Sequence, residues 1–488
     1  MTHSPVATHT HVSMHPDRRW LALIVLCLGV LMIVLDTTIV NVALPSIKVD
    51  LKFEDITLAW VVNAYLLTYG GFLLLGGRLG DLYGHRRLFL VGIAAFTLAS
   101  LACGLSHTQM ALVVARAVQG LGGAVVTAVA LSLIMDLFTD PKDRAKAMGV
   151  YGFVCAGGGS LGAMLGGVLT SSLSWHWVFL VNLPIGIGVV VASLRLLPAA
   201  SRTAASNHLD VWGAITVTAA LMLAVYAIVN GNQVGWLSST TIGQLAIALA
   251  LLVSFLWIEA RVRVPLMPLR LFQLRNLVVS NIVGVLWAAA MFAWFFLSAL
   301  YMQLVLGYGP MEVGLAFLPA NLIMALFSLG LSAKLVMRFG IRRPLVTGLA
   351  LAACGLLWFA HASEHGQFLR DILPGMVLLG IGAGVAFNPV LLAAMNDVGP
   401  SESGLASGVV NTAFMMGGSL GLAVLASLAA ARTHGVTVAG GVDASALTSG
   451  YQLAFLVGAC FAALGAVASA VFLRTPHAAA GEQAPAMH

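Results

Sequence analysis

The chain has 488 residues, of which 60% are apolar and only 9% charged. Because soluble domains carry about 25% charged residues, this composition excludes a soluble enzyme, a nucleic-acid-binding module and a disordered scaffold. The net charge of +6 does not indicate nucleic acid, since the basic residues lie in short loops between apolar runs. The five cysteines lie in apolar stretches without metal-ligand spacing, which is typical of small buried side chains. We therefore expect a polytopic membrane protein.

Fourteen apolar stretches have the length that a helix needs to cross a bilayer, which is about 20 residues. We expect an all-α integral membrane protein with fourteen transmembrane helices, in these ranges: 20–44, 57–77, 87–106, 109–133, 145–170, 176–197, 211–230, 241–258, 276–302, 313–333, 344–361, 371–394, 404–430 and 450–473.

The distribution of lysine and arginine predicts the orientation of these helices. If the N-terminus lies in the cytoplasm, 19 of the 24 basic residues fall on cytoplasmic segments, four fall outside, and one, Arg116, lies within a span. Such a bias follows the positive-inside rule. We therefore expect the tails 1–17 and 476–488 to be cytoplasmic.

An internal repeat indicates two related halves. Residues 147–162 read AMGVYGFVCAGGGSLG and residues 406–421 read ASGVVNTAFMMGGSLG, so eight of sixteen positions are identical at an offset of 259. Chance similarity between glycine-rich membrane helices is the alternative. Parallel repeats are typical of transporters that move around a site at the membrane midplane. We expect six-helix bundles at 18–200 and 263–475, with two inserted helices at 201–262.

Two charges lie within the predicted spans. Asp36 is the only acidic residue that we place in a span, and Arg116 is the only basic one. Each charge costs about 2.5–3.5 kcal/mol at a helix centre on insertion scales, so each needs a partner or a wet cavity. Counted from the external helix ends, Asp36 lies about 13 Å deep and Arg116 about 10 Å deep. We hypothesise that they form a proton-coupling pair; the alternative is a static ion pair that fixes helix contacts.

Four motifs occur in chain order. The first span ends in LDTTIVNVALP (35–45), the second is followed by GRLGDLYGHRRLFL (77–90), the fourth contains RAVQGLGGA (116–124), and the sixth begins WVFLVNLPIG (177–186). Together with fourteen spans, they resemble the fourteen-span drug:proton antiporters of the major facilitator superfamily. The resemblance implies a major facilitator fold, whose first and fourth spans in each half line a central cavity. It also implies a bacterial inner (plasma) membrane location.

The loop after the second span has two explanations. Gly77 and Gly84 allow a tight turn, and the resemblance implies that Asp81, Arg86 and Arg87 form a conformational latch that holds the two halves closed on the cytoplasmic side. For the two arginines, plain positive-inside topology explains the charges equally well.

The fifth span carries a glycine ladder. Gly158, Gly162 and Gly166 are four residues apart, and Gly167 follows. Small residues at this spacing let two helix backbones approach closely, so we expect a helix-packing role. The family usually has a proline where this chain has Ala163, so the kink that a proline gives is absent from the pattern.

Polar residues in the spans and an aromatic stripe in span nine predict a substrate cavity. Aromatic and methionine side chains suit bulky apolar or cationic compounds. Helix packing or lipid contact is the alternative for the stripe, and interhelical hydrogen bonding is the alternative for the polar residues. For Asn182, Asn321 and Asn411 we expect such bonding, which is the commoner role of polar residues in spans, and a substrate role is the alternative. The predicted cavity residues are Asn41, Gln119, Trp287, Met291, Trp294, Phe295 and Asn388.

The Walker motif of ATPases and the HExxH and CxxC motifs of metal sites do not occur in the sequence. We therefore expect no enzyme, no catalytic residue, no metal and no cofactor, with the proton gradient as energy source. The favoured function is a proton-coupled antiporter that exports small lipophilic or cationic compounds by alternating access (multidrug efflux and antibiotic resistance). Its partners would be a small-molecule substrate, protons and the lipid bilayer, without nucleic acid, and it would be a monomer. The alternatives are a dedicated exporter of one endogenous metabolite, such as an antibiotic or siderophore, and a non-transporting membrane sensor.

Overall fold

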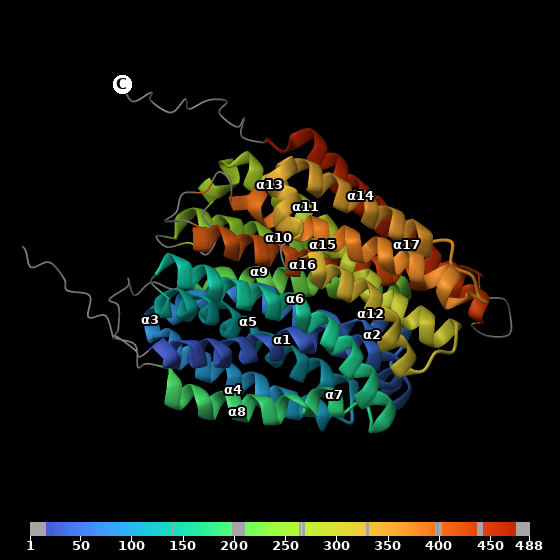
Figure 1. The fold of residues 1–488 in the computed structure, drawn as a ribbon. Coiled ribbons are helices and arrows are strands. Elements are labelled where there is room, and N and C mark those ends of the chain that lie inside the picture. The colour runs from blue at the N-terminus through green and yellow to red at the C-terminus, as the bar shows by residue number, and fades with distance from the viewer. Residues whose placement is uncertain are drawn as a thin grey trace, which may run out of the picture.

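The computed structural model describes residues 16–138, 140–197, 210–262, 265, 269–327, 331–395, 398, 403–436 and 443–474. Within these ranges the chain is helical and without strands, and the long helices run roughly along one common axis (Figure 1). By length and composition, ten described helices are able to cross a membrane, and Leu161–Ser172 and Pro310–Leu326 are shorter apolar helices. Each of the fourteen predicted ranges contains a described helix.

The helices of the N-terminal half are α1 (Pro16–Leu51), α2 (Asp55–Leu58), α3 (Trp60–Tyr83), α4 (His85–Gly104), α5 (Gln109–Leu137), α6 (Pro141–Ser172), α7 (Trp177–Leu180) and α8 (Asn182–Leu196). The inserted helices are α9 (Val211–Val234) and α10 (Ser239–Arg261). The C-terminal half contains η1 (Leu269–Gln273), α11 (Arg275–Leu300), η2 (Tyr301–Val305), α12 (Pro310–Leu326), α13 (Ser332–Phe339), α14 (Arg342–Phe359), η4 (Phe368–Ile372), α15 (Leu373–Met395), α16 (Ser403–Val436) and α17 (Ala444–Phe472).

Several helices begin at a side-chain cap. Thr108, Asp210, Ser238 and Asp443 each accept a hydrogen bond from the backbone N–H three residues further on. The first N–H groups of a helix have no partner within the helix, and a capping oxygen satisfies one of them. These polar residues therefore determine where apolar segments become helical.

One predicted span is divided into two helices for a clear local reason. The predicted span 176–197 consists of α7 and α8, which are interrupted at Val181. Pro184 has no N–H to donate to the carbonyl of Leu180, four residues earlier, and so the regular helical bonding stops there. The predicted spans 57–77 and 313–333 likewise overlap two helices each, α2 with α3 and α12 with α13.

The structure corrects one expectation about charges. Asp36 is not the only acidic residue in a span, because Glu259 lies in the last turn of α10, within the candidate span Ser239–Arg261, and is 3% exposed. Asp210, which caps α9, is also buried. The error arose because the predicted span 241–258 ends one residue before Glu259, and the predicted span 211–230 begins one residue after Asp210.

The two halves meet along two seams. In one seam α6 packs against α12, and in the other α3 packs against α16. The inserted helix α9 contacts both α3 and α16, and α10 packs on α9 (Figure 1). Hydrogen bonds join the halves away from the ends where Pro16 and Arg474 lie: Gln303 Nε2 donates to the carbonyl of Val42 at 3.0 Å, and Ser419 Oγ donates to Asn63 Oδ1 at 3.1 Å. The predicted domain boundaries near 200 and 263 fall outside the described residues.

Candidate functional site

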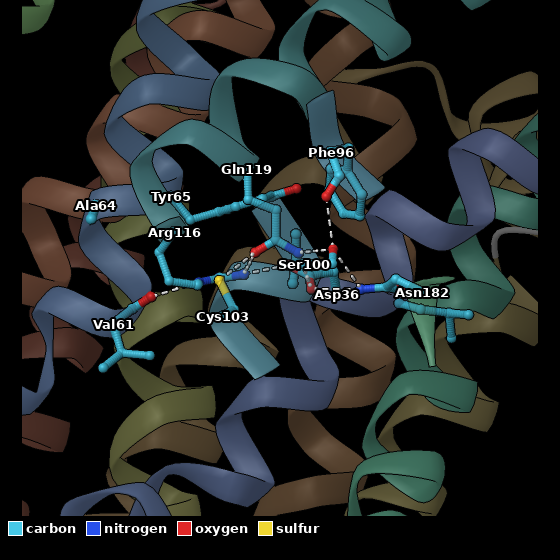
Figure 2. A network of polar contacts seen from close by, with 12 residues as sticks. Asp36, Val61, Ala64, Tyr65, Phe96, Ser100, Cys103, Arg116, Gln119 and Asn182 are labelled. Carbon is cyan, nitrogen blue, oxygen red and sulfur yellow. Dashed lines mark hydrogen bonds and ion pairs between the residues drawn. The ribbon is translucent and has the colours of Figure 1, made fainter. Parts of the chain in front are cut away.

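A buried ion pair lies in the N-terminal half. Asp36, in α1, and Arg116, in α5, are both fully shielded from solvent, and Arg116 Nη1 donates to Asp36 Oδ2 (Figure 2). The two residues are 80 positions apart in the sequence. The structure therefore brings together the two charges that the sequence places at similar depths.

Neutral side chains complete the hydrogen bonding of this carboxylate. Gln119 Nε2 donates to Asp36 Oδ1 and to Ser100 Oγ, at 2.8 Å in both cases. Asn182 Nδ2 donates to the same two oxygens at 3.2 and 3.3 Å. Ser100 Oγ in turn donates to the carbonyl of Phe96 at 2.8 Å. Helices α1, α4, α5 and α8 thus converge on one buried acid (Figure 2).

The guanidinium of Arg116 is held independently of Asp36. Its Nε donates to the backbone carbonyl of Val61 in α3 at 2.8 Å, and its Nη1 also donates to Gln119 Oε1 at 2.7 Å. The Tyr65 ring lies 4.3 Å from the guanidinium carbon, which is a cation–π geometry. Nη2 has no hydrogen-bond partner in the described part of the chain. The cation therefore stays anchored to α3 if the carboxylate changes its charge.

The carboxyl group of Asp36 thus meets a guanidinium and the amide groups of Gln119 and Asn182 in the interior of the protein. Removing one partner of a buried ion pair costs about 3–5 kcal/mol, because the other charge is left unpaired. Asp36 is the one carboxylic acid in this network.

The other predicted cavity residues lie outside this network. Asn41 Nδ2 donates to the carbonyl of Thr37 in its own helix, at 3.3 Å. Trp294 is 1% exposed and packs edge-on against Phe317 of α12 and Phe359 of α14, and Phe295 stacks on Phe317. Trp287 and Met291 are also buried in α11, and Asn388 is half-buried in α15.

The predicted latch is only partly described. Gly84 has a φ of +91° between α3 and α4, a backbone conformation that glycine adopts readily. Arg86 Nη2 donates to the carbonyl of Leu194 in α8, within the same half, at 2.7 Å, and Arg87 is exposed. The side chain of Asp81 lies outside the described part of the structure, and Gly77 lies near Ala128.

Sequence reasoning missed one contact in this loop. His85 Nδ1 lies 3.1 Å from Asp136 Oδ2, which joins the start of α4 to the end of α5. Asp136 lies three residues beyond the predicted end of span four, so its contact with this loop was not predicted from the sequence.

The glycine ladder of α6 contacts two helices. A Cβ at Gly158 would lie 2.8 Å from Val34, and one at Gly166 would lie 2.6 Å from the carbonyl oxygen of Ile39, both in α1. A Cβ at Gly167 would instead lie 2.7 Å from the carbonyl oxygen of Pro310 in α12. Gly162 faces α1 in the same way as Gly158. The glycine ladder therefore packs α6 against α1 of its own half, whereas Gly167 packs it against α12 of the other half.

Comparison with known proteins places the chain in a family. The model of the Major Facilitator Superfamily matches residues 26–422. The chain belongs to this superfamily. The family prediction is thus confirmed, and so is the fold: the protein is a multi-pass membrane transporter rather than an enzyme, and its substrate is a small molecule.

Several relatives match this transporter over most of their length. The puromycin resistance protein pur8 of Streptomyces alboniger is 38% identical over 93% of this chain and 92% of its own. The cephamycin export protein CmcT of Amycolatopsis lactamdurans is 39% identical over 85% and 86%. The multidrug resistance protein Stp of Mycobacterium tuberculosis (strain CDC 1551 / Oshkosh) is 36% identical over 84% and 76%.

Solved structures share the fold of this transporter at low sequence identity. A mutant of the nucleoside transporter NupG has a TM-score of 0.65 at 12% identity and covers 93% of this chain and 100% of its own. The inward open xylose transporter XylE from E. coli has a TM-score of 0.64 at 13% identity, covering 94% and 98%.

Proposed function

We propose that this transporter is a proton-coupled antiporter that exports small lipophilic or cationic compounds by alternating access. The buried Asp36–Arg116 ion pair carries the proposal, because a titratable acid within a span is costly and typical of proton relays. The relatives that are named for multidrug resistance and antibiotic export support the export direction and the kind of substrate.

The geometry supports a simple exchange step. When a proton binds Asp36, its carboxylate becomes a neutral acid and the electrostatic attraction to Arg116 is lost. Arg116 keeps its bonds to Val61 and Gln119 and its contact with Tyr65, so α1 is the element released. When the proton leaves on the other side, the ion pair re-forms. Each proton that crosses a potential of 100 mV supplies about 2.3 kcal/mol.

We infer the orientation and location from the charge bias. The excess of basic residues on the segments that lie on the side of the termini supports cytoplasmic termini in the inner (plasma) membrane, because cytoplasmic loops carry more lysine and arginine. Protons would then enter from the side where Gln303 and Val42 join the halves.

The decisive experiment uses purified protein in liposomes that contain a pH-sensitive dye. A panel of lipophilic cations, neutral drugs and antibiotics is added under an imposed proton gradient, and the proton flux that each compound evokes is measured. Asp36→Asn removes the titratable acid at nearly constant shape. Asp50→Asn is the matched control, since Asp50 lies in the same helix but bonds to Trp175 instead.

We expect wild type and Asp50→Asn to show flux with several unrelated compounds, and Asp36→Asn to show only the background leak. Compound-evoked flux of wild-type size in folded Asp36→Asn would disprove the coupling role. A second candidate is a dedicated exporter of one compound, which the relatives named for puromycin and cephamycin favour. Flux with a single compound, which the others do not compete away, would select that candidate.

A further inference from the structure

One buried asparagine in the C-terminal half makes no hydrogen bond. Asn321, in α12, is 1% exposed, and both its Nδ2 and its Oδ1 lack a partner among the residues that the structure describes. The interhelical partner that the sequence predicts for it is thus not found there. A buried carboxamide without partners loses its bonds to water and gains none in return, which destabilises the fold. Unsatisfied groups of this kind call for an explanation, and a ligand is one.

The position of Asn321 points to the space between the halves. Pro310, Gly314, Phe317 and Asn321 recur every three or four residues and so share one face of α12. On this face, the carbonyl oxygen of Pro310 lies against Gly167, and a Cβ at Gly314 would lie 2.8 Å from the carbonyl oxygen of Ala163. Both of these contacts are with α6, in the other half, so the carboxamide is on the helix face that meets the seam.

The depth of Asn321 agrees with a substrate site. It lies eleven residues after the first residue of α12, which is about 16 Å along the helix axis. The hydrocarbon core of a bilayer is about 30 Å thick, so the carboxamide is close to its middle. In transporters built from repeats, substrate sites lie near the midplane at the interface of the repeats.

The neighbouring side chains indicate which chemical groups fit. Phe317, one turn before Asn321, stacks on Phe295 with ring centroids 5.4 Å apart, and the Trp294 ring lies 5.8 Å from that of Phe317. The Trp294 Nε1 donor is also buried and without a partner in the described chain. An aromatic cluster thus lies one helical turn from the unused donor and acceptor of Asn321, and its Trp294 carries an unused donor of its own; all of these groups are neutral.

We propose that Asn321 binds a polar group of the transported compound, and that this group is neutral and contains both an acceptor and a donor, as an amide or a hydroxyl does. The inference rests on the proposed export function and adds a residue of the C-terminal half that selects the substrate. A site built to bond such a group discriminates against compounds without it, because the carboxamide then remains unpaired.

The test compares Asn321→Leu, which keeps the approximate shape and removes the amide, with Asn276→Leu. Asn276 is equally buried at 2% exposure, but its Nδ2 and Oδ1 both bond to the backbone of Arg474. The two probes are puromycin, which carries amide and hydroxyl groups, and tetraphenylphosphonium, which has no hydrogen-bonding group. Thermal unfolding without compound and the KM of transport into liposomes are measured for each variant.

For Asn321→Leu we expect an unchanged or higher unfolding temperature and a KM for puromycin about tenfold higher, the equivalent of one hydrogen bond, with the KM for tetraphenylphosphonium unchanged. For Asn276→Leu we expect a lower unfolding temperature and no change in the ratio of the two KM values. An equal ratio in Asn321→Leu and wild type would overturn the inference while leaving the export function standing. A wild type that transports neither probe would instead overturn the export function on which the inference rests.

Discussion

At the scale of single residues, the hydrogen bonds around Asp36 differ in length. The amide groups of Gln119 and Asn182 both donate to Asp36 and to Ser100, Gln119 at 2.8 Å in each case and Asn182 at 3.2 and 3.3 Å. Asn182 is also the first residue of α8, directly after the break at Val181. In the proposed exchange, we therefore expect the longer bond, at the end of a broken helix, to break first when Asp36 is protonated.

Replacing Asn182 by leucine is expected to weaken proton coupling several-fold and to destabilise the protein by about 1–2 kcal/mol, because one donor to a buried carboxylate is lost. Proton flux per exported molecule and thermal unfolding are the measurements. Ser193→Ala is the control on the same helix, since Ser193 Oγ is buried and bonds to nothing in the described chain. Equal coupling in Asn182→Leu and Ser193→Ala would show that Asn182 has no part in the exchange.

The meeting of Asp36 and Arg116 could be predicted because both charges have to avoid lipid and lie at similar depths. Gln119, which was expected in the substrate cavity, lies one turn after Arg116, and this spacing accounts for its bond to the guanidinium. Interhelical bonding was expected for Asn182 and is found. Its partner Asp36 and the part played by Ser100 could not be predicted, since these bonds depend on how α4 and α8 are rotated about their axes. That rotation is determined by packing such as Thr97 against Gly186, which a hydropathy pattern does not contain.

At the scale of helices, α6 depends on the absence of side chains. A Cβ at Gly162 would lie 2.0 Å from Thr38 Oγ1 and 2.8 Å from the carbonyl oxygen of Leu35. The hydroxyl can rotate away, but the carbonyl belongs to α1 and cannot. The small-residue spacing was visible in the sequence, whereas the assignment of Gly167 to a second helix, α12, required the structure.

Gly162→Ala is therefore expected to destabilise the transporter by about 1–3 kcal/mol, which is the usual cost of overpacking. Gly188→Ala in α8 is the matched control, because no atom lies within 4 Å of a Cβ there and alanine is the better helix former. Thermal unfolding in detergent compares the two variants. An equal or higher unfolding temperature for Gly162→Ala would contradict the close packing of α6 on α1.

A second contact between elements depends on pH. His176, one residue before the candidate span Trp177–Leu196, stacks on Trp175 at 3.8 Å and faces His107 at 6.4 Å. Burial lowers the pKa of His176 below its usual 6.5, and His107 adds to this effect against the opposing charge of Asp50. The neutral form is thus favoured in the folded protein.

Because the folded pKa is lower than the unfolded one, His176 contributes stability above pH 6.5, and this contribution is lost as the pH falls through that value. We expect the unfolding temperature to fall between pH 7.5 and pH 5.5, and to fall less in His176→Gln, which cannot titrate. Unfolding curves at both pH values measure the difference. An identical fall in wild type and variant would assign the pH dependence to other groups.

At the scale of the whole molecule, the inserted helices make the two seams unequal. A Cβ at Gly71 of α3 would lie 2.0 Å from Thr218 Oγ1 of α9, and Ser427 of α16 donates to the carbonyl of Ile228 in α9 at 3.3 Å. The insertion thus spans the α3–α16 seam and contacts both halves. The repeat predicted that two helices are added between the halves, but not that they pack along one side of the interface.

The proposed alternating access requires that the contacts closing this interface break when the halves move. Ser419 Oγ and Asn63 Oδ1 are 3.1 Å apart, on α16 and α3, and both residues are fully buried. The double variant Asn63→Cys and Ser419→Cys, in a chain whose five native cysteines are replaced by alanine, is expected to form a disulfide under oxidation. Because this disulfide would join α3 of one half to α16 of the other, it would keep the α3–α16 interface closed. Transport in liposomes is then expected to stop on oxidation and to return on reduction. The two single-cysteine variants, treated in the same way, should keep their activity, and undiminished transport by fully cross-linked protein would rule out alternating access through this seam.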